Sequence, residues 1–256
     1  MTGKDRDVKP PSATLLALEG RGLFDMASLA TAAPFLTLAP RGTRHAVIVL
    51  PGLGADDRST VAIRSFLSSL GYDVHGWSLG RNVRPSEADM PAILAQISRL
   101  RAAIDLPVSL VGWSRGGIMA REAARQIPAA VRMVITLGSP FAAPRASNAG
   151  RIWRLLTGDK DATPTPERMK LLARPIPVPA TSIYTRSDGV VAWQACLEEA
   201  GPRRENIEVR TTHIGLGFHP PALWVIADRL AQPFGEWRPF RPDPLVAGFF
   251  PGSDST

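Results

Sequence analysis

The stretch VSLVGWSRGGIMAREAARQI, residues 108–127, decides the fold class of this 256-residue chain. It opens with a short apolar run, typical of a strand buried on both faces, and continues as a helix from Arg115. The two meet at GWSRG, residues 112–116, which matches the pattern G-x-S-x-G. A serine at such a turn is strained and exposes its hydroxyl, and the flanking glycines leave room where a side chain would clash. The pattern predicts a nucleophile at Ser114; the alternative is a glycine-rich turn with an idle serine.

Strand and helix patterns alternate on both sides of this stretch. We expect further strands at residues 45–50, 72–77, 131–138, 181–185 and 207–212, and helices at 58–70, 87–104, 191–200 and 221–231. Such alternation predicts βαβ units, hence an α/β fold with a mainly parallel sheet and helices on both faces. The length suits a single domain over residues 1–256.

Three segments lie outside this alternation. We expect residues 1–38 to be an N-terminal helical lead, with a helix or helix pair over 13–38 that breaks near Pro34. Residues 141–178 are irregular and predict a small cap or lid over the site. Residues 233–256 are rich in proline and phenylalanine and predict a tail that wraps the surface.

A base and an acid for Ser114 are predicted from position. Chemistry in parallel sheets gathers in loops at the carboxyl ends of the strands. His213 follows the strand at 207–212 and is the expected base, with His219 as the alternative. Asp188 follows the strand at 181–185 and is the expected acid, although an Asp before Gly189 is also a common turn former. The chain order nucleophile, acid, base supports the three together.

Acyl transfer also needs donors for an oxyanion. The backbone N–H groups of Arg115, after the nucleophile, and of Leu53, in the loop PGLG at 51–54, are the candidates. The glycines there do not continue into a dinucleotide fingerprint, because position 57 is Asp.

Five motifs together resemble the lipase/esterase branch of the α/β-hydrolase superfamily: PGLG (51–54), GWSRGG (112–117), TLGSP (136–140), RSDGVV (186–191) and THIGLG (212–217). The likeness spans about residues 43–232. It is strongest to small bacterial hydrolases similar to triacylglycerol lipases and to glycosylphosphatidylinositol inositol-deacylases. It implies a carboxylic-ester hydrolase with Ser114, Asp188 and His213 as its triad and no metal or organic cofactor. Many members have histidine where this chain has Trp113 and Phe141.

Substrate contacts are expected around the cap. Candidates for the pocket are Trp113, Phe141, Trp153 and Val190. The segment 141–178 carries seven basic and three acidic side chains. Such a lid suits docking on an anionic lipid surface, the alternative being an amphipathic loop that only covers the core.

Composition narrows the remaining classes. The formal net charge of +7 favours anionic partners, but no nucleic-acid motif is present. The single cysteine, Cys196, excludes an intrachain disulfide and a multi-cysteine metal site. The polar N-terminus is not a secretory signal, so we expect a cytoplasmic protein that is peripheral to a membrane if the lid docks on lipid. The other functions that remain open are a thioesterase or acyltransferase on the same triad, and a non-catalytic protein that binds lipid or a membrane surface.

Overall fold

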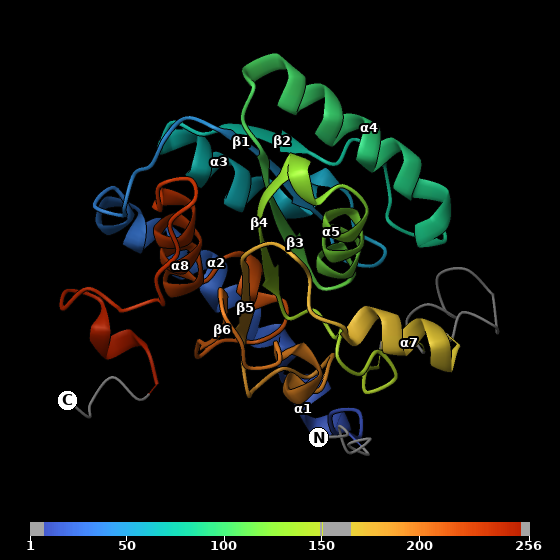
Figure 1. The fold of residues 1–256 in the computed structure, drawn as a ribbon. Coiled ribbons are helices and arrows are strands. Elements are labelled where there is room, and N and C mark those ends of the chain that lie inside the picture. Colours follow the sequence, from blue (N-terminus) through green and yellow to red (C-terminus); the bar gives the residue numbers. More distant parts are fainter. Residues whose placement is uncertain (1–7, 149, 151–164, 252–256) are drawn as a thin grey trace.

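A six-stranded parallel sheet in the order β2-β1-β3-β4-β5-β6 forms the centre of the molecule (Figure 1). The computed structural model describes residues 8–148, 150 and 165–251. The strands are β1 (Ala46–Leu50), β2 (Asp73–Gly76), β3 (Val108–Trp113), β4 (Val131–Leu137), β5 (Ala180–Tyr184) and β6 (Arg204–Glu208). The predicted α/β class with a mainly parallel sheet is confirmed.

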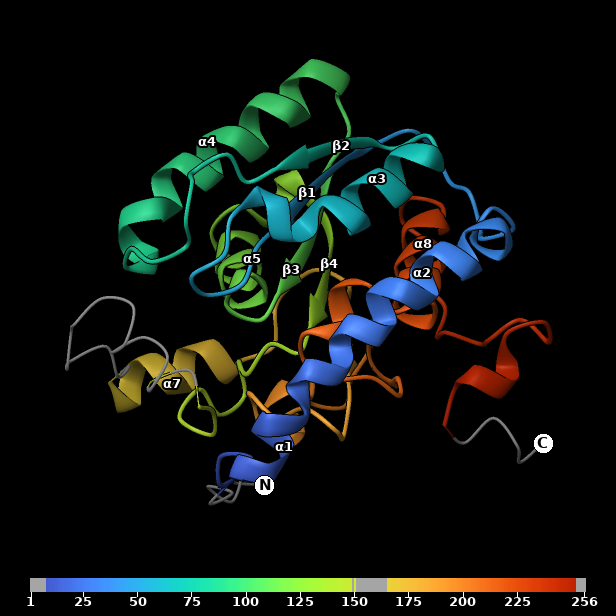
Figure 2. The ribbon, with the colours of Figure 1, turned by 180° about the vertical axis from the view of Figure 1, so that it is seen from behind.

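Helices cover both faces of the sheet (Figures 1 and 2). One face packs against α2 (Gly22–Leu36), α3 (Val61–Ser69) and α8 (Pro220–Ala231), and the other against α4 (Ser86–Ile104) and α5 (Arg115–Gln126). Strand β1 shows the division, because Val47 and Val49 face the first group and Ile48 and Leu50 the second. All its residues are buried. Burying each such side chain contributes about 1.5–3 kcal/mol.

The N-terminal segment differs from the prediction in where it breaks. It comprises α1 (Ala13–Ala17), a 3₁₀ turn at Leu18–Arg21 and then α2. Pro34 does not break the helix, since it lies in the last turn of α2, where a missing N–H removes a single bond. The chain instead tightens at the 3₁₀ turn, which directs Glu19 into the protein, with 4% of its surface exposed.

The prediction of a helix at 191–200 is wrong, because only a 3₁₀ turn at Trp193–Cys196 forms there. Leu197 is already extended. Glu198 then bonds Asn206 on β6: its N–H donates to Oδ1 (2.7 Å) and its carbonyl accepts from Nδ2 (3.0 Å). The Glu198 carboxylate also pairs with the buried Arg121 of α5. These tertiary bonds take the groups that a helix would have used.

The last strand lies earlier than the expected 207–212. Strand β6 pairs with β5 from Ala180 opposite Arg204 to Tyr184 opposite Glu208, and both end there. Beyond this point the carbonyl of Thr211 accepts the side-chain hydroxyl of Thr185 (2.7 Å) instead of a ladder bond. Residues 209–212 therefore form the start of a loop at the carboxyl edge of the sheet.

The described part of the C-terminal segment, residues 233–251, has a single 3₁₀ turn, Ala247–Phe249, and no α-helix or strand. Val246 and Phe250 are buried against the cluster that contains α8. Phe240 packs edge-on against Phe250 at a ring separation of 5.0 Å. Aromatic side chains thus attach this segment to the core.

Candidate functional site

Ser114 occupies a strained turn between β3 and α5. Its backbone has φ 53° and ψ −120°, a conformation that L-residues rarely adopt and that costs about 1–3 kcal/mol. Its N–H donates to the carbonyl of Leu137 at the end of β4 (2.7 Å). Its side chain stands at the carboxyl edge of the sheet, before the N-terminus of α5. The predicted placement of this serine between strand and helix is confirmed.

Two glycines allow the close packing around this turn. A Cβ at Gly112 would overlap the backbone of Gly117, and a Cβ at Gly116 would overlap the carbonyl of Leu50. Helix α5 therefore lies directly against β3 and β1. That contact fixes the direction in which α5 begins behind Ser114, with the positive end of the helix dipole toward the serine.

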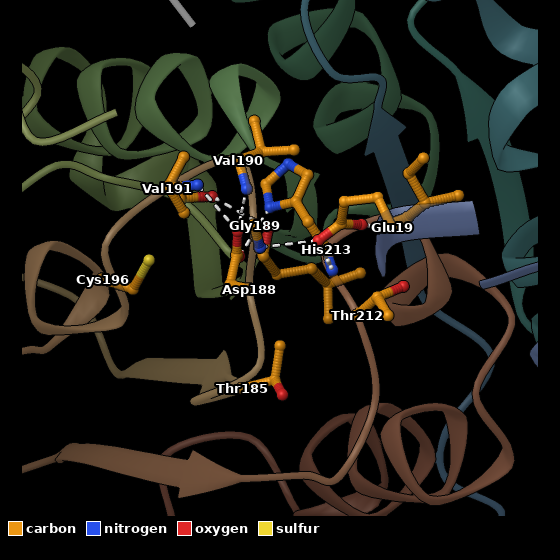
Figure 3. A network of polar contacts seen from close by, with 12 residues as sticks. Glu19, Thr185, Asp188, Gly189, Val190, Val191, Cys196, Thr212 and His213 are labelled. Atoms are coloured by element: carbon orange, nitrogen blue, oxygen red, sulfur yellow. Dashed lines mark hydrogen bonds and ion pairs between the residues drawn. The ribbon is translucent and has the colours of Figure 1, made fainter. Parts of the chain in front are cut away.

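Asp188 and His213 form a buried pair in the loops after β5 and β6 (Figure 3). Asp188 Oδ2 lies 2.7 Å from His213 Nδ1. Asp188 Oδ1 accepts the backbone N–H groups of Val190 (2.8 Å) and Val191 (2.7 Å). The side chain of Asp188 is 1% exposed and that of His213 is 8% exposed, so solvent screens this pair little. A carboxylate fixed in this way holds one tautomer of the imidazole, with the proton on Nδ1.

The pKa of His213 lies above its ordinary value of 6.5, as the net result of opposing influences. Burial is the largest single influence and lowers this pKa, because it disfavours the charged ring. The charge and hydrogen bond of Asp188, together with the charge of Glu19, favour the imidazolium and outweigh it. A raised pKa makes the neutral ring a stronger base.

Ser114 lies at the same sheet edge as this pair. The carbonyl that binds the Ser114 N–H belongs to Leu137, and the next residue, Gly138, has φ +54°. A Cβ at Gly138 would stand 2.9 Å from His213 Nδ1 and 3.2 Å from Asp188 Oδ2. Between these described residues the structure has the bond from His213 to Asp188 and none between Ser114 and His213.

The loop after β1 lies beside the serine. A Cβ at Gly52 would lie 3.4 Å from the Cβ of Ser114. The N–H of Leu53 donates to no acceptor among the described residues. The buried Asn82 holds this loop, since its Nδ2 donates to the Pro51 carbonyl (2.8 Å). The loop beside Ser114 thus holds one backbone N–H, that of Leu53, without an acceptor among the described residues.

Arg115, the other oxyanion candidate, is the first residue of α5. Its guanidinium turns toward the segment before α4, where it donates to the Arg84 carbonyl and to Ser86 Oγ (3.4 Å). Burial lowers the pKa of Arg115. The side chain thus braces the start of α4, and the backbone N–H lies at a helix N-terminus, where such groups suit an anion.

The predicted pocket residues are differently placed. Trp113 is packed in the core, and its indole Nε1 donates to the His213 carbonyl (3.1 Å). Phe141 is 1% exposed, and the Arg121 guanidinium carbon lies 3.6 Å from the centre of its ring. Val190 is half-buried beside Asp188, and Trp153 lies outside the described residues. Their part in a substrate pocket stays a prediction.

The described part of the predicted cap contains α7 (Pro166–Ala173). Arg168 on this helix pairs with Glu87 (3.2 Å) and with Glu122 of α5. The positive charge at this position is therefore partly neutralised within the protein. Among the described residues, no helix is long and apolar enough to cross a membrane.

The other histidines do not contact Asp188. His45 is buried before β1, at the opposite edge, where its Nε2 lies 2.8 Å from Ser109 Oγ. Burial, helped by the charge of Arg132, lowers the pKa of His45 to about 4. His219, the alternative base, instead bonds Asp25 of α2 through Nδ1 (2.8 Å).

Sequence reasoning missed two residues at the site, Glu19 and Asn82. Glu19 is the one acidic residue between Ala13 and Phe24, which is the only local signal for it. Asn82 carries no signal beyond its place in a loop. Among residues 8–148, 150 and 165–251, no three His, Cys, Asp or Glu side chains are grouped so as to hold a metal ion.

No family model matches the chain, and no curated protein matches it at a significant level. Solved structures do share its fold. The mature Bacillus licheniformis lipase BlEst2 is 16% identical with a TM-score of 0.58, over 76% of this chain and 95% of that one. A monoacylglycerol lipase from Paleococcus ferrophilus is 17% identical (TM-score 0.53; 74% and 97%). Lipase B from Aspergillus fumigatus is 17% identical (TM-score 0.56) over 77% of this chain, which spans only 56% of that enzyme.

Proposed function

We propose that this chain, which has the fold of the α/β-hydrolase superfamily, is a serine hydrolase that cleaves carboxylic esters. The observation that carries the proposal is the buried pair of Asp188 and His213 at the sheet edge where Ser114 stands in its strained turn. Structural neighbours that are lipases support an ester as the substrate class. Fold alone does not choose a substrate, so the geometry of the site carries the argument.

In the proposed reaction, His213 Nε2 takes the proton of the Ser114 hydroxyl while Ser114 Oγ attacks the ester carbonyl carbon. The carbonyl π electrons move to oxygen, and the backbone N–H groups of Leu53 and Arg115 bind this oxyanion. Collapse of the tetrahedral intermediate breaks the bond to the alcohol, which leaves with the proton from His213. Water then attacks the acyl-serine by the same steps, releasing the acid and restoring Ser114.

Asp188 has two tasks in this mechanism. By accepting a hydrogen bond from the Nδ1–H group of His213, it leaves Nε2 unprotonated and able to act as the base toward Ser114. Its charge also stabilises the imidazolium that forms when the proton is taken. The distance from Ser114 to His213 shortens on substrate binding in this proposal, as hydrogen bonds in unliganded sites are often long.

The first test is labelling of the folded protein with a fluorophosphonate probe, followed by peptide mapping. We expect stoichiometric modification at Ser114 and turnover of short nitrophenyl esters, both lost in Ser114→Ala. Ser187→Ala is the matched control, since it removes a neighbouring serine hydroxyl and should keep both. Folded protein that is neither labelled nor active would refute the proposal and leave a lipid-binding scaffold.

A panel of acyl groups then separates the neighbouring reactions. Turnover of thioesters well above that of matched oxygen esters would assign a thioesterase. Transfer of the acyl group to an added alcohol, in preference to water, would assign an acyltransferase. Both reactions use the same three side chains, so Ser114→Ala is the control for each.

A further inference from the structure

The carboxylate of Glu19 connects the two loops that carry Asp188 and His213. Its Oε1 accepts the backbone N–H groups of Gly189 (2.7 Å) and His213 (3.1 Å). Its Oε2 accepts the N–H of Ile214 (2.9 Å). Figure 3 shows Glu19 reaching toward these loops beside the Asp188–His213 pair.

Only an acceptor with two oxygens suits this arrangement. Three N–H groups converge on Glu19, and a carboxylate offers acceptors alone. Gly189 directly follows Asp188, while the other two donors are His213 and the residue after it. One side chain therefore sets the spacing between the backbone that carries the acid and the backbone that carries the base.

The N-terminal arm, residues 11–36, brings Glu19 to this position. The arm packs so closely that a Cβ on Gly189 would overlap the Leu15 carbonyl. Further along, Asp25 Oδ2 accepts the hydroxyl of Thr211 (2.7 Å), in the loop before His213. Figure 2 shows α1 and α2 running across the molecule past the loops after β5 and β6. The position of Glu19 is thus set by contacts on both sides of it.

We propose that Glu19 is a positioning residue, which holds the Asp188 loop and the His213 loop in the relative placement that general-base catalysis needs. This inference rests on the proposed function, since it assigns a role toward the same base. Glu19 acts through the backbone of these loops and does not touch the reacting atoms. A shift of about 1 Å in such a site costs about a hundredfold in rate.

The charge of Glu19 gives the proposal a second consequence. The charged groups around His213 are Asp188 in the loop after β5 and Glu19 in the arm; Asp25 and His219 form their own pair nearby. Burial lowers the pKa of His213, and the charges of Asp188 and Glu19 raise it. Removing the Glu19 charge should therefore lower the His213 pKa, whereas a brace that only stabilised the fold would leave it unchanged.

The test compares three full-length variants with the wild type in stability, kcat, KM and the pH profile of kcat/KM on nitrophenyl butyrate. Glu19→Gln keeps the shape but removes the charge and one acceptor. Glu19→Asp keeps the charge with a shorter reach. Glu205→Gln is the matched control. Glu205 lies at the amino-terminal end of β6, away from the site, and its carboxylate also accepts a backbone N–H, that of Phe240 (2.7 Å), and a guanidinium N–H of Arg229.

We expect Glu19→Gln to lower kcat about tenfold to a hundredfold with little change in KM, and to move the acidic limb of the profile to lower pH. Glu19→Asp should lower kcat but leave the acidic limb of the profile at its wild-type pH. Glu205→Gln should lose stability without moving that limb. If Glu19→Gln does not fold, Glu19→Asp decides the question through kcat.

Two results overturn the proposal while the proposed function stands. One is wild-type kcat and an unmoved acidic limb in Glu19→Gln, with Ser114 still labelled. The other is the same shift of the limb in Glu205→Gln. A wild-type protein with neither labelling nor turnover overturns both proposals, and the wild-type measurement alone identifies that case.

Discussion

The indole Nε1 of Trp113 donates a 3.1 Å hydrogen bond to the backbone carbonyl of His213. The residue before the proposed nucleophile thereby holds the loop of the proposed base. The ring also packs edge-on against Phe218, and a Cβ on Gly217 would lie 2.6 Å from it. Trp113 thus connects the end of β3 with the loop that leads into α8.

Trp113→Phe should weaken this connection. The ring largely remains, but the buried carbonyl of His213 loses its donor, and a lost hydrogen bond of this kind costs about 1 kcal/mol of unfolding free energy. We expect kcat to fall more than KM rises, measured by steady-state kinetics alongside denaturant unfolding. Trp224→Phe, which trims a buried indole stacked on Phe35, is the control and should lose stability alone. Equal kcat in the two variants would contradict the role given to Trp113.

Asp188→Asn should leave the fold intact and lower kcat by about 10³–10⁴-fold, because the amide favours the wrong tautomer of His213. The measurement is kcat on a short nitrophenyl ester. Asp105→Asn is the control: Asp105 ends α4 at the opposite edge with φ 50°, a conformation that Asn tolerates. Loss of activity in both variants, or in neither, would argue against Asp188 as the acid.

The pH profile of kcat/KM should have its acidic midpoint above 6.5. His213 must be neutral to accept a proton, and its pKa is raised, so activity appears only as pH rises through that value. The same shift stabilises the folded protein below pH 6.5, and this stabilisation is lost as pH rises through the folded-state pKa. A neutral ester substrate keeps the profile free of substrate ionisation. A midpoint at or below 6.5 would show that the charges of Asp188 and Glu19 do not outweigh the effect of burial on the pKa of the base.

Gly138→Ala should reduce both stability and kcat. The position has φ +54°, and the new Cβ would stand 2.8 Å from Leu216 Cδ1 and 2.9 Å from His213 Nδ1, so the base must shift. Gly80→Ala is the matched control. Gly80 has φ +75°, but an added Cβ would meet no atom within 4 Å, so this variant should show only the backbone strain of about 1 kcal/mol. Thermal unfolding and kcat on the same ester give the comparison. An active Gly138→Ala would mean that the site tolerates displacement of His213.

The comparison of sequence with structure separates local from distant causes. The bounds of β3 and α5 follow from the residues 108–127 themselves, because the apolar run of β3 and the contact between Gly112 and Gly117 act within a few residues. The placement of Asp188 and His213 at one edge follows from the rule that parallel strands end together. Glu19 could not be predicted, since its partners lie 170 to 195 residues further along the chain. The missing helix at 191–200 has a similar cause, in that Glu198 is held by Asn206 and Arg121.

The place of Glu19 in the chain also bears on the order in which the site assembles. The N–H groups that its carboxylate binds belong to residues 189, 213 and 214, which lie 170 to 195 residues further along the chain. Contacts of such long sequence separation form late, because the closure entropy of the intervening chain must be overcome first. Ser114 belongs to the contiguous β3–α5 unit, whereas His213 is placed by the distant arm. The three parts of the site, which are the arm, the loop after β5 and the loop after β6, therefore assemble together, and the base reaches its place beside Ser114 only when they have done so.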